Sequence, residues 1–361
     1  MDVLISSLVG GVIGLIIAVI FEDPLNSAKR RLVKLARSAF HRPRSIDPIN
    51  QTFSLGKRNS SWLVIDGNGE MTYTPEAIRC LVDSTPVLLP PEIQQLRDNI
   101  EKRELSNKDK GLSYQWPGPL YALERYAIGR TNPEENLEVA FTFRPTDYYT
   151  FQATVMSLDY NIMQPPAIMT IRQKYLQGCD LVQPVPFLSN GFGISLAIIT
   201  KDRKLILSWR SDHAGARPGE LDVSVVEAVH PLNDRSTTSL NPDLYRTAIR
   251  GIQEEIGIDA LQENITFLGF GVDIEYYQWN IVGIVRISDT AQKALENRRS
   301  GLSGKWEAKN LEVIEAEPRN VFSYIKDKKI WSTGLLTIYW ALVYEYGRKR
   351  VDMAAKAVFD A

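Results

Sequence analysis

Two adjacent carboxylates, Glu254 and Glu255, are the residues of this chain whose type and spacing best suit chemistry. A hard cation such as Mg²⁺ prefers oxygen ligands and is commonly held by one or two carboxylates together with phosphate oxygens and water. Residues four apart share one face of a helix, so Arg250 can contact Glu254. The spacing indicates either a site for a divalent cation or a solvated helix end.

A single helix must position these side chains, and the sequence predicts it between Asn241 and Gly257. Asn241 is a favourable N-cap, and Pro242 suits the first helical position, where a missing N–H costs nothing. Gly257 suits the left-handed residue that ends a helix. At 100° per residue one face is apolar and is expected to pack, while the other face remains available for a ligand. The packing residues are Tyr245, Ala248, Ile249, Ile252 and Ile256.

The segment from Arg250 to Ile258 resembles the second half of the Nudix box, G-x5-E-x7-R-E-U-x-E-E-x-G-U, in which U is aliphatic. The Arg, both Glu, the Gly and both aliphatic residues stand in register. In that family the helix carries carboxylates that hold Mg²⁺ against a substrate diphosphate. The resemblance implies that Arg250, Glu254 and Glu255 are catalytic, and that Glu254 and Glu255 bind Mg²⁺ or Mn²⁺.

Two positions depart from the box. Gly251 stands where the family has a Glu directly after the Arg, and Pro242 stands where the family has an earlier Glu. In the family the missing Glu after the Arg completes the metal cluster or helps to activate water. Glycine inside a helix costs about 1 kcal/mol against alanine. Gly251 therefore indicates close approach by a ligand or another segment, or a site that has lost its original chemistry.

The strand predicted over residues 222–229 contains the acid best placed to replace the missing carboxylate, Glu227. We expect Glu227 to be a catalytic and metal-binding residue, and Arg250 to make a charge-assisted bond with Glu227 or Glu254. His230 is a candidate proton carrier or an ordinary loop residue. Further candidate acids from later strands and loops are Asp273, Glu275 and Glu307.

Strands are predicted on both sides of the helix without regular alternation, which indicates an α+β fold with a mixed sheet and helices packed against it. The order of elements is similar to the Nudix fold, so we expect residues 191–361 to form a Nudix-like domain. Residues 46–190 are expected to form a mixed α/β region that precedes it. The apolar stretch Ile330–Tyr346 predicts a buried or interface helix. Strands are predicted at residues 194–200, 205–210, 222–229, 266–273 and 277–287.

The first residues predict a membrane anchor. Val3 to Phe21 is an uncharged apolar run about long enough to span a bilayer as a helix. Seven Lys and Arg residues and no acid follow between residues 24 and 44, which places the C-terminal bulk in the cytoplasm. We expect a single transmembrane helix in residues 1–23 and a basic amphipathic juxtamembrane segment in residues 24–45, with the protein in the cell membrane.

The predicted membrane helix and the composition indicate which partners the chain can have. Gly10 and Gly14 belong to a repeat of small residues along which helices can associate, or they reflect the usual glycine content of membrane helices. The net charge of −1 does not suggest a nucleic-acid binder. Two cysteines are too few for a disulfide framework or a zinc site.

Three functions fit the sequence. The first is a membrane-anchored, Mg²⁺-dependent Nudix-like hydrolase that cleaves a nucleoside diphosphate linked to another moiety. The second is a catalytically degenerate Nudix-like sensor or effector that binds a nucleotide and signals at the membrane, for example in bacterial stress or phage defence. The third is a purely structural membrane-associated protein. Metal-dependent nucleotide binding separates the third from the others, and turnover separates the first from the second.

Overall fold

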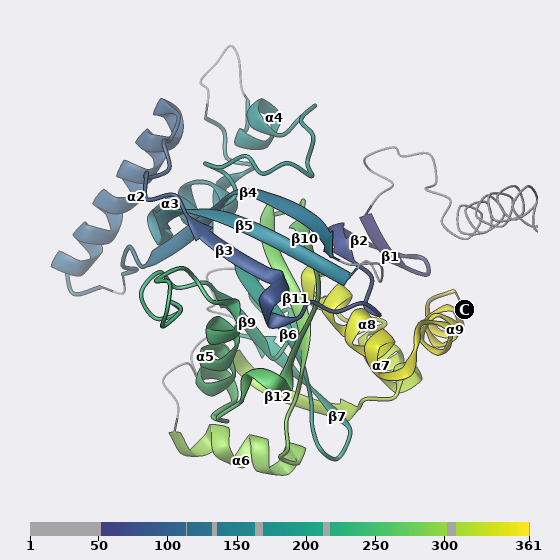
Figure 1. Ribbon diagram of the computed structural model, residues 1–361. Coiled ribbons are helices and arrows are strands. Elements are labelled where there is room, and N and C mark those ends of the chain that lie inside the picture. The colour runs from purple at the N-terminus through teal and green to yellow at the C-terminus, as the bar shows by residue number, and fades with distance from the viewer. Residues whose placement is uncertain are drawn as a thin grey trace, which may run out of the picture. The chain divides into compact units, whose positions relative to one another are not determined.

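A nine-stranded mixed sheet is the centre of the fold (Figure 1). The computed structural model describes residues 52–112, 114–131, 136–162, 169–211, 217–301 and 308–360. The strands of this sheet are β1 (Thr52–Leu55), β2 (Arg58–Gly67), β6 (Gly193–Ile199), β7 (Lys204–Arg210), β8 (Leu221–Val223), β9 (Val225–Ala228), β10 (Ile265–Asp273), β11 (Gln278–Arg286) and β12 (Ala308–Glu315). Their order is β1-β2-β10-β11-β6-β7-β12, and β11 and β6 are parallel.

The strand predicted over residues 222–229 is in fact two short strands that fill a fork in the sheet. β6 and β7 pair at Ile198 and Ile199 and then diverge. β8 pairs with β7, and β9 pairs with β6. Ser224 lies between the two short strands. The fork matters for function because β9 carries Glu227 and leads into the helix that carries Arg250.

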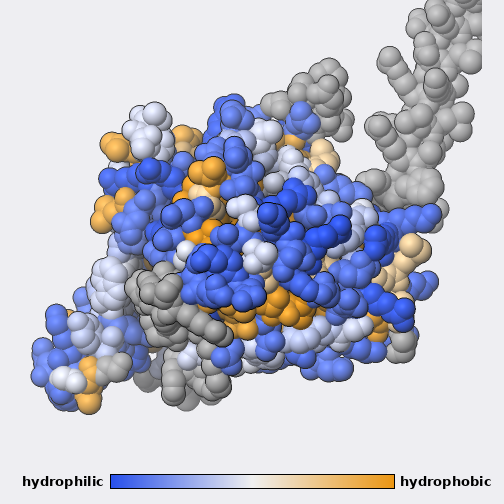
Figure 2. All heavy atoms as spheres, turned by 90° about the horizontal axis from the view of Figure 1, so that it is seen from below, coloured by the Kyte–Doolittle hydropathy of each residue, from blue (hydrophilic) through white to orange (hydrophobic). Residues whose placement is uncertain are grey.

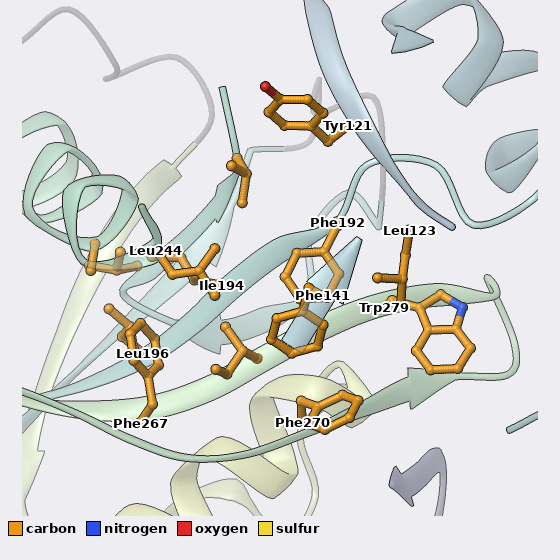
Figure 3. Packing of buried hydrophobic residues seen from close by; sticks show 14 of the residues in the cluster. Tyr121, Leu123, Phe141, Phe192, Ile194, Leu196, Leu244, Phe267, Phe270 and Trp279 are labelled. Atoms are coloured by element: carbon orange, nitrogen blue, oxygen red, sulfur yellow. The ribbon is translucent and has the colours of Figure 1, made fainter. Parts of the chain in front are cut away.

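A second, three-stranded sheet covers one face of the large sheet. It consists of β3 (Ile78–Val82), β5 (Asn136–Asp147) and β4 (Pro119–Thr131), with β5 in the middle. The two sheets share one hydrophobic core, in which the ring of Phe141 lies 5.0 Å from the rings of both Phe192 and Phe270 (Figure 3). Burial of this much aromatic surface binds the two sheets firmly together.

Helices cover both faces of the large sheet. Along β11, Trp279 and Ile281 enter the core shared with the small sheet, while Val282 and Ile284 point to a second core formed with the last three helices. The mixture of strands and helices confirms the predicted α+β class. The helices are α2 (Pro91–Asp109), α3 (Tyr148–Ala153), α4 (Ile171–Tyr175), α5 (Leu244–Ile256), α6 (Ala291–Gly301), α7 (Pro318–Ile325), α8 (Ser332–Tyr346) and α9 (Arg348–Phe359).

Helix α8 matches the predicted buried helix, since its residues from Thr333 to Val343 are all buried. No helix in the described ranges combines the length and the apolar character needed to cross a bilayer. The predicted membrane helix, the juxtamembrane segment and the association surface at Gly10 and Gly14 lie outside the described residues. On the face shown in Figure 2, hydrophilic residues predominate and hydrophobic residues occur in small groups.

The boundary expected near residue 190 does not separate two compact units. Residues from Thr52 to the end of the chain form a single unit. The physical reason is strand pairing across the boundary, because β2 is hydrogen-bonded to β10 along Trp62 to Gly67. The shared aromatic core adds to this connection.

Candidate functional site

Helix α5 begins two residues later than expected at its N-terminus and ends as expected at its C-terminus. The N-cap is Asp243, whose carboxylate accepts hydrogen bonds from the backbone N–H groups of Tyr245 and Arg246. The expected N-cap at Asn241 is wrong because its carbonyl accepts a bond from Ser236 N–H within the preceding loop. Gly257 has a φ of 75°, which confirms the predicted left-handed end of the helix.

Gly251 allows helix α5 to pack directly against β9. A Cβ atom at residue 251 would lie 2.5 Å from Cγ of Glu227 and 2.9 Å from Cγ1 of Val225, both closer than atoms tolerate. The close approach predicted from this glycine is therefore confirmed, and the approaching segment is β9. The side chain of Glu227 occupies the space that a carboxylate at residue 251 would need.

The guanidinium of Arg250 gathers the predicted residues around it. Its Nη1 donates to Oε2 of Glu227 at 3.0 Å and to Oε2 of Glu254 at 3.1 Å. Its Nε and Nη2 donate to the two carboxylate oxygens of Asp234 at 2.8 and 2.9 Å, and Nη2 also donates to the carbonyl oxygen of Ala228 at 2.9 Å. These contacts use all five N–H groups of an arginine. Arg250 therefore holds Glu227 beside Glu254.

The cluster is buried on one side and accessible on the other. The side chain of Asp234 is 0% exposed, those of Arg250 and Glu227 are 19% and 18% exposed, and that of Glu254 is 41% exposed. Arg250 thus presents two carboxylates toward the accessible side while its other edge is held inside the fold. A ligand can reach Glu254 without rearrangement of the chain.

Burial shifts the acidity of the carboxyl group of Glu227. Burial raises its pKa to about 8; the charge of Arg250 opposes this shift, and the charges of Glu254 and Glu255 add to it. Burial alone would lower the pKa of Arg250, but the surrounding carboxylates raise it, so this guanidinium keeps its charge. A carboxyl group with a pKa close to the working pH can both donate and accept a proton.

Asp234 is the site residue that the sequence did not reveal. It lies sixteen residues before Arg250, in the loop between β9 and α5, and its carboxylate also accepts a bond from His230 N–H at 2.8 Å. No periodicity links these positions, so an acid in this loop looks like any solvated loop acid. The nearby imidazole of His230 accepts bonds at Nδ1 from Leu232 and Asn233 N–H, which supports its interpretation as a loop residue.

The charge of Glu255 reaches Glu227, and each of the other candidate acids has surroundings of its own. Glu255 lines a polar cavity of about 20 Å³ beside Asp222 and Ser224, at the fork between β7 and β9. Asp273 accepts bonds from Ser61 Oγ and from Trp331 Nε1. Glu275 lies in the turn after Asp273, and Glu307 lies outside the described residues.

The expected three-carboxylate metal site is not preformed. In the part of the chain that the structure describes, no three Asp, Glu, His or Cys side chains lie close enough together to hold one ion. Arg250 holds Glu227 and Glu254 as neighbours, and Glu255 lines the small cavity beside Asp222. Glu227 and Glu254 remain neighbours, and this donor set fits Mg²⁺, which commonly takes one or two carboxylates and completes its shell with phosphate oxygens and water.

Comparison with protein-family models and with curated proteins gives no match. Comparison with solved structures gives the Nudix domain of Shewanella oneidensis NrtR in complex with ADP ribose, at 15% identity, 46% coverage of this chain, 94% coverage of that chain and a TM-score of 0.31. A MutT protein from Methanosarcina mazei matches at 12% identity, 44% and 95% coverage and a TM-score of 0.28. A MutT/nudix family protein from Enterococcus faecalis matches at 14% identity, 45% and 66% coverage and a TM-score of 0.30. These likenesses are weak, so a family assignment rests on the residues of the chain itself.

Proposed function

We propose that this chain is a Nudix-like hydrolase that cleaves a nucleoside diphosphate linked to another moiety, with Mg²⁺ or Mn²⁺ as its cofactor. The observation that carries the proposal is the position of Glu227, which Arg250 holds beside Glu254 where the box lacks its own carboxylate. Residues 3–21 would anchor the enzyme in the cell membrane with its C-terminal part in the cytoplasm, and Gly10 and Gly14 would support self-association. This part of the proposal rests on the sequence pattern.

The residues of the site have distinct roles in this proposal. Glu227 and Glu254 would hold the cation, and Glu255 is the adjacent carboxylate on the last turn of α5. A bound cation supplies neutralisation of the diphosphate charge and a lower pKa for a bound water molecule. Without a bound cation burial raises the pKa of Glu227 to about 8, and a bound cation would favour its ionised form and lower that pKa. Arg250 acts as a positioning residue, because all five of its N–H groups bind protein oxygens.

A second candidate is a sensor that binds a nucleotide diphosphate without turnover and signals at the membrane. Gly251 favours this candidate, because it removes the carboxylate that follows the arginine in the box. Both functions predict metal-dependent binding, and only the hydrolase predicts a product.

The test is isothermal titration of the full-length protein in detergent with a panel of nucleoside diphosphate derivatives, with and without Mg²⁺, and chromatography of the same samples. Glu227→Gln and Glu254→Gln are the test variants. Glu101→Gln is the matched control, since Glu101 and Glu254 have equally exposed side chains and each is paired with an arginine four residues earlier.

Product formation that is lost in both test variants and kept in the control supports the hydrolase. Metal-dependent binding without product supports the sensor. Absence of binding across the panel contradicts both functions.

A further inference from the structure

The guanidinium of Arg250 has two edges with different surroundings. The edge formed by Nε and Nη2 meets Asp234 in a bidentate pair and also reaches the carbonyl oxygen of Ala228. The Nη1 atom meets Glu227 and Glu254. Asp234 is fully buried, whereas Glu254 is 41% exposed. Bidentate arginine–carboxylate pairs fix direction as well as distance, so the buried edge determines where Nη1 points.

Asp234 is itself fixed by the loop that carries it. Its N–H donates to the carbonyl oxygen of His230 at 3.1 Å, and its carboxylate accepts from the N–H of His230 at 2.8 Å. Its carbonyl oxygen accepts from the N–H of Asp243 at 2.7 Å, directly at the N-cap of α5. Three local bonds therefore hold Asp234 in place before its interaction with Arg250 is counted.

We infer that Asp234 is the positioning residue of the proposed site. It holds the guanidinium of Arg250 so that Nη1 faces Glu227 and Glu254 at once. The assignment of a role in turnover rests on the proposed function, but the positioning itself does not. When a ligand takes one of the two carboxylates from Nη1, Arg250 remains fixed by Asp234, and the helix and loop keep their places.

The loss of this anchor has a specific consequence. Asp234→Asn keeps an oxygen for the N–H of His230 but removes the charge and one acceptor of the bidentate pair. The guanidinium of Arg250 is then free to turn toward the accessible carboxylate of Glu254, and Glu227 loses its orientation. Partners that orient the groups of a metal site typically contribute about 10- to 100-fold in activity or metal affinity. We expect Asp234→Asn to lower kcat by about that factor and to change KM much less.

A double-mutant cycle on full-length protein in detergent tests the positioning without any need for turnover. The melting temperature is measured for Asp234→Asn, for Glu254→Gln and for the double variant, all without divalent cations. If Asp234 directs Arg250 toward Glu254, the Tm loss caused by Asp234→Asn is different when Glu254 is already replaced. The control cycle combines Asp234→Asn with Glu101→Gln on the distant helix α2, and these two losses should add.

The outcomes separate the two proposals. Both the positioning role and the hydrolase are supported if three results are obtained together. The first cycle shows coupling, the control cycle is additive, and Asp234→Asn lowers kcat. Coupling in a protein that forms no product supports the positioning and contradicts the hydrolase. Additivity in the first cycle overturns the positioning role even if the enzyme is active. If Asp234→Asn does not fold, Asp234→Glu replaces it in the cycle, because the longer side chain keeps the charge but displaces the bidentate pair.

Discussion

Among the arginine–carboxylate clusters of the described residues, those of Arg250 and Arg217 differ most clearly in what surrounds them. Arg250 binds three carboxylates, one of which is 41% exposed. Arg217 pairs with Asp222 at 3.1 Å, and the two side chains are only 5% and 2% exposed. The guanidinium of Arg217 also lies 3.4 Å from the ring centroid of Trp331, just before α8. In the first cluster a ligand can reach the carboxylate of Glu254. In the second cluster both side chains are shielded from solvent.

Burial accounts for the difference in electrostatics. Burial lowers the pKa of Arg217, with Asp222 opposing that shift, whereas the carboxylates around Arg250 outweigh burial and raise its pKa. A buried ion pair contributes little net stability, but loss of one partner leaves an uncompensated charge. The Arg217 cluster therefore has the character of a structural pair that joins β8 to the segment before α8. The Arg250 cluster has the character of a site.

The largest effect is expected at the buried pair. Arg217→Met removes the cation that bonds the buried carboxylate of Asp222, although the charge of Arg210 remains, and should lower the free energy of unfolding by about 3–5 kcal/mol. Urea denaturation checks this value. The double variant Arg217→Met with Asp222→Asn removes both charges and keeps an acceptor for Val223 N–H, so it should recover most of the loss. If Arg217→Met lowers the free energy of unfolding by less than the loss of an exposed ion pair would, the Arg217–Asp222 pair does not have this structural role.

A smaller effect is expected where α5 touches β9. Gly251→Ala gains about 1 kcal/mol of helix propensity. Its new methyl group must nevertheless displace Glu227 and Val225, and such overpacking costs about 1–3 kcal/mol. We expect a net loss of stability in urea denaturation, and a smaller loss in a Glu227→Ala background, where Cγ is absent. An equal loss in both backgrounds would show that Glu227 does not occupy this space.

A further effect is a dependence of stability on pH. Glu227 has a pKa of about 8 in the folded chain against an ordinary value of 4.5, so the folded chain binds the extra proton between these two values. The free energy of unfolding should therefore fall as pH rises from 4.5 to 8, by at most about 1.4 kcal/mol per pH unit for one proton.

The measurement is denaturation across this pH range in the presence of EDTA, with wild type and two variants. Glu227→Gln should flatten the slope, because glutamine cannot titrate. Glu101→Gln should keep the wild-type dependence of stability on pH, because Glu101 pairs with Arg97 on α2 and does not belong to the Arg250 cluster. If Glu227→Gln leaves the pH dependence of the free energy of unfolding unchanged, another group is responsible for it. The pKa of Glu227 would then no longer distinguish the Arg250 cluster from the Arg217 cluster.

Local patterns were sufficient for the elements that carry the site. The spacing of apolar residues and Gly257 predicted the packed face and the end of α5, and alternating or apolar runs predicted β6, β7, β10 and β11. These patterns succeed because each depends on neighbours within a few residues along the chain. The start of α5 was misplaced because the preceding loop engages the carbonyl of Asn241 and Asp243 caps the helix instead.

The sequence by itself determined that Arg250 and Glu254 share a helix face, and it allowed Gly251 to mark either close approach by another segment or a ligand, or a site that has lost its original chemistry. Only the tertiary structure decided between these, because β9 meets α5 through packing across the fork in the sheet. It also decided that β2 joins the same sheet as β10, across the expected boundary. Asp234 illustrates the reason: its role comes from complete burial against Arg250, sixteen residues away, and no local pattern encodes that burial.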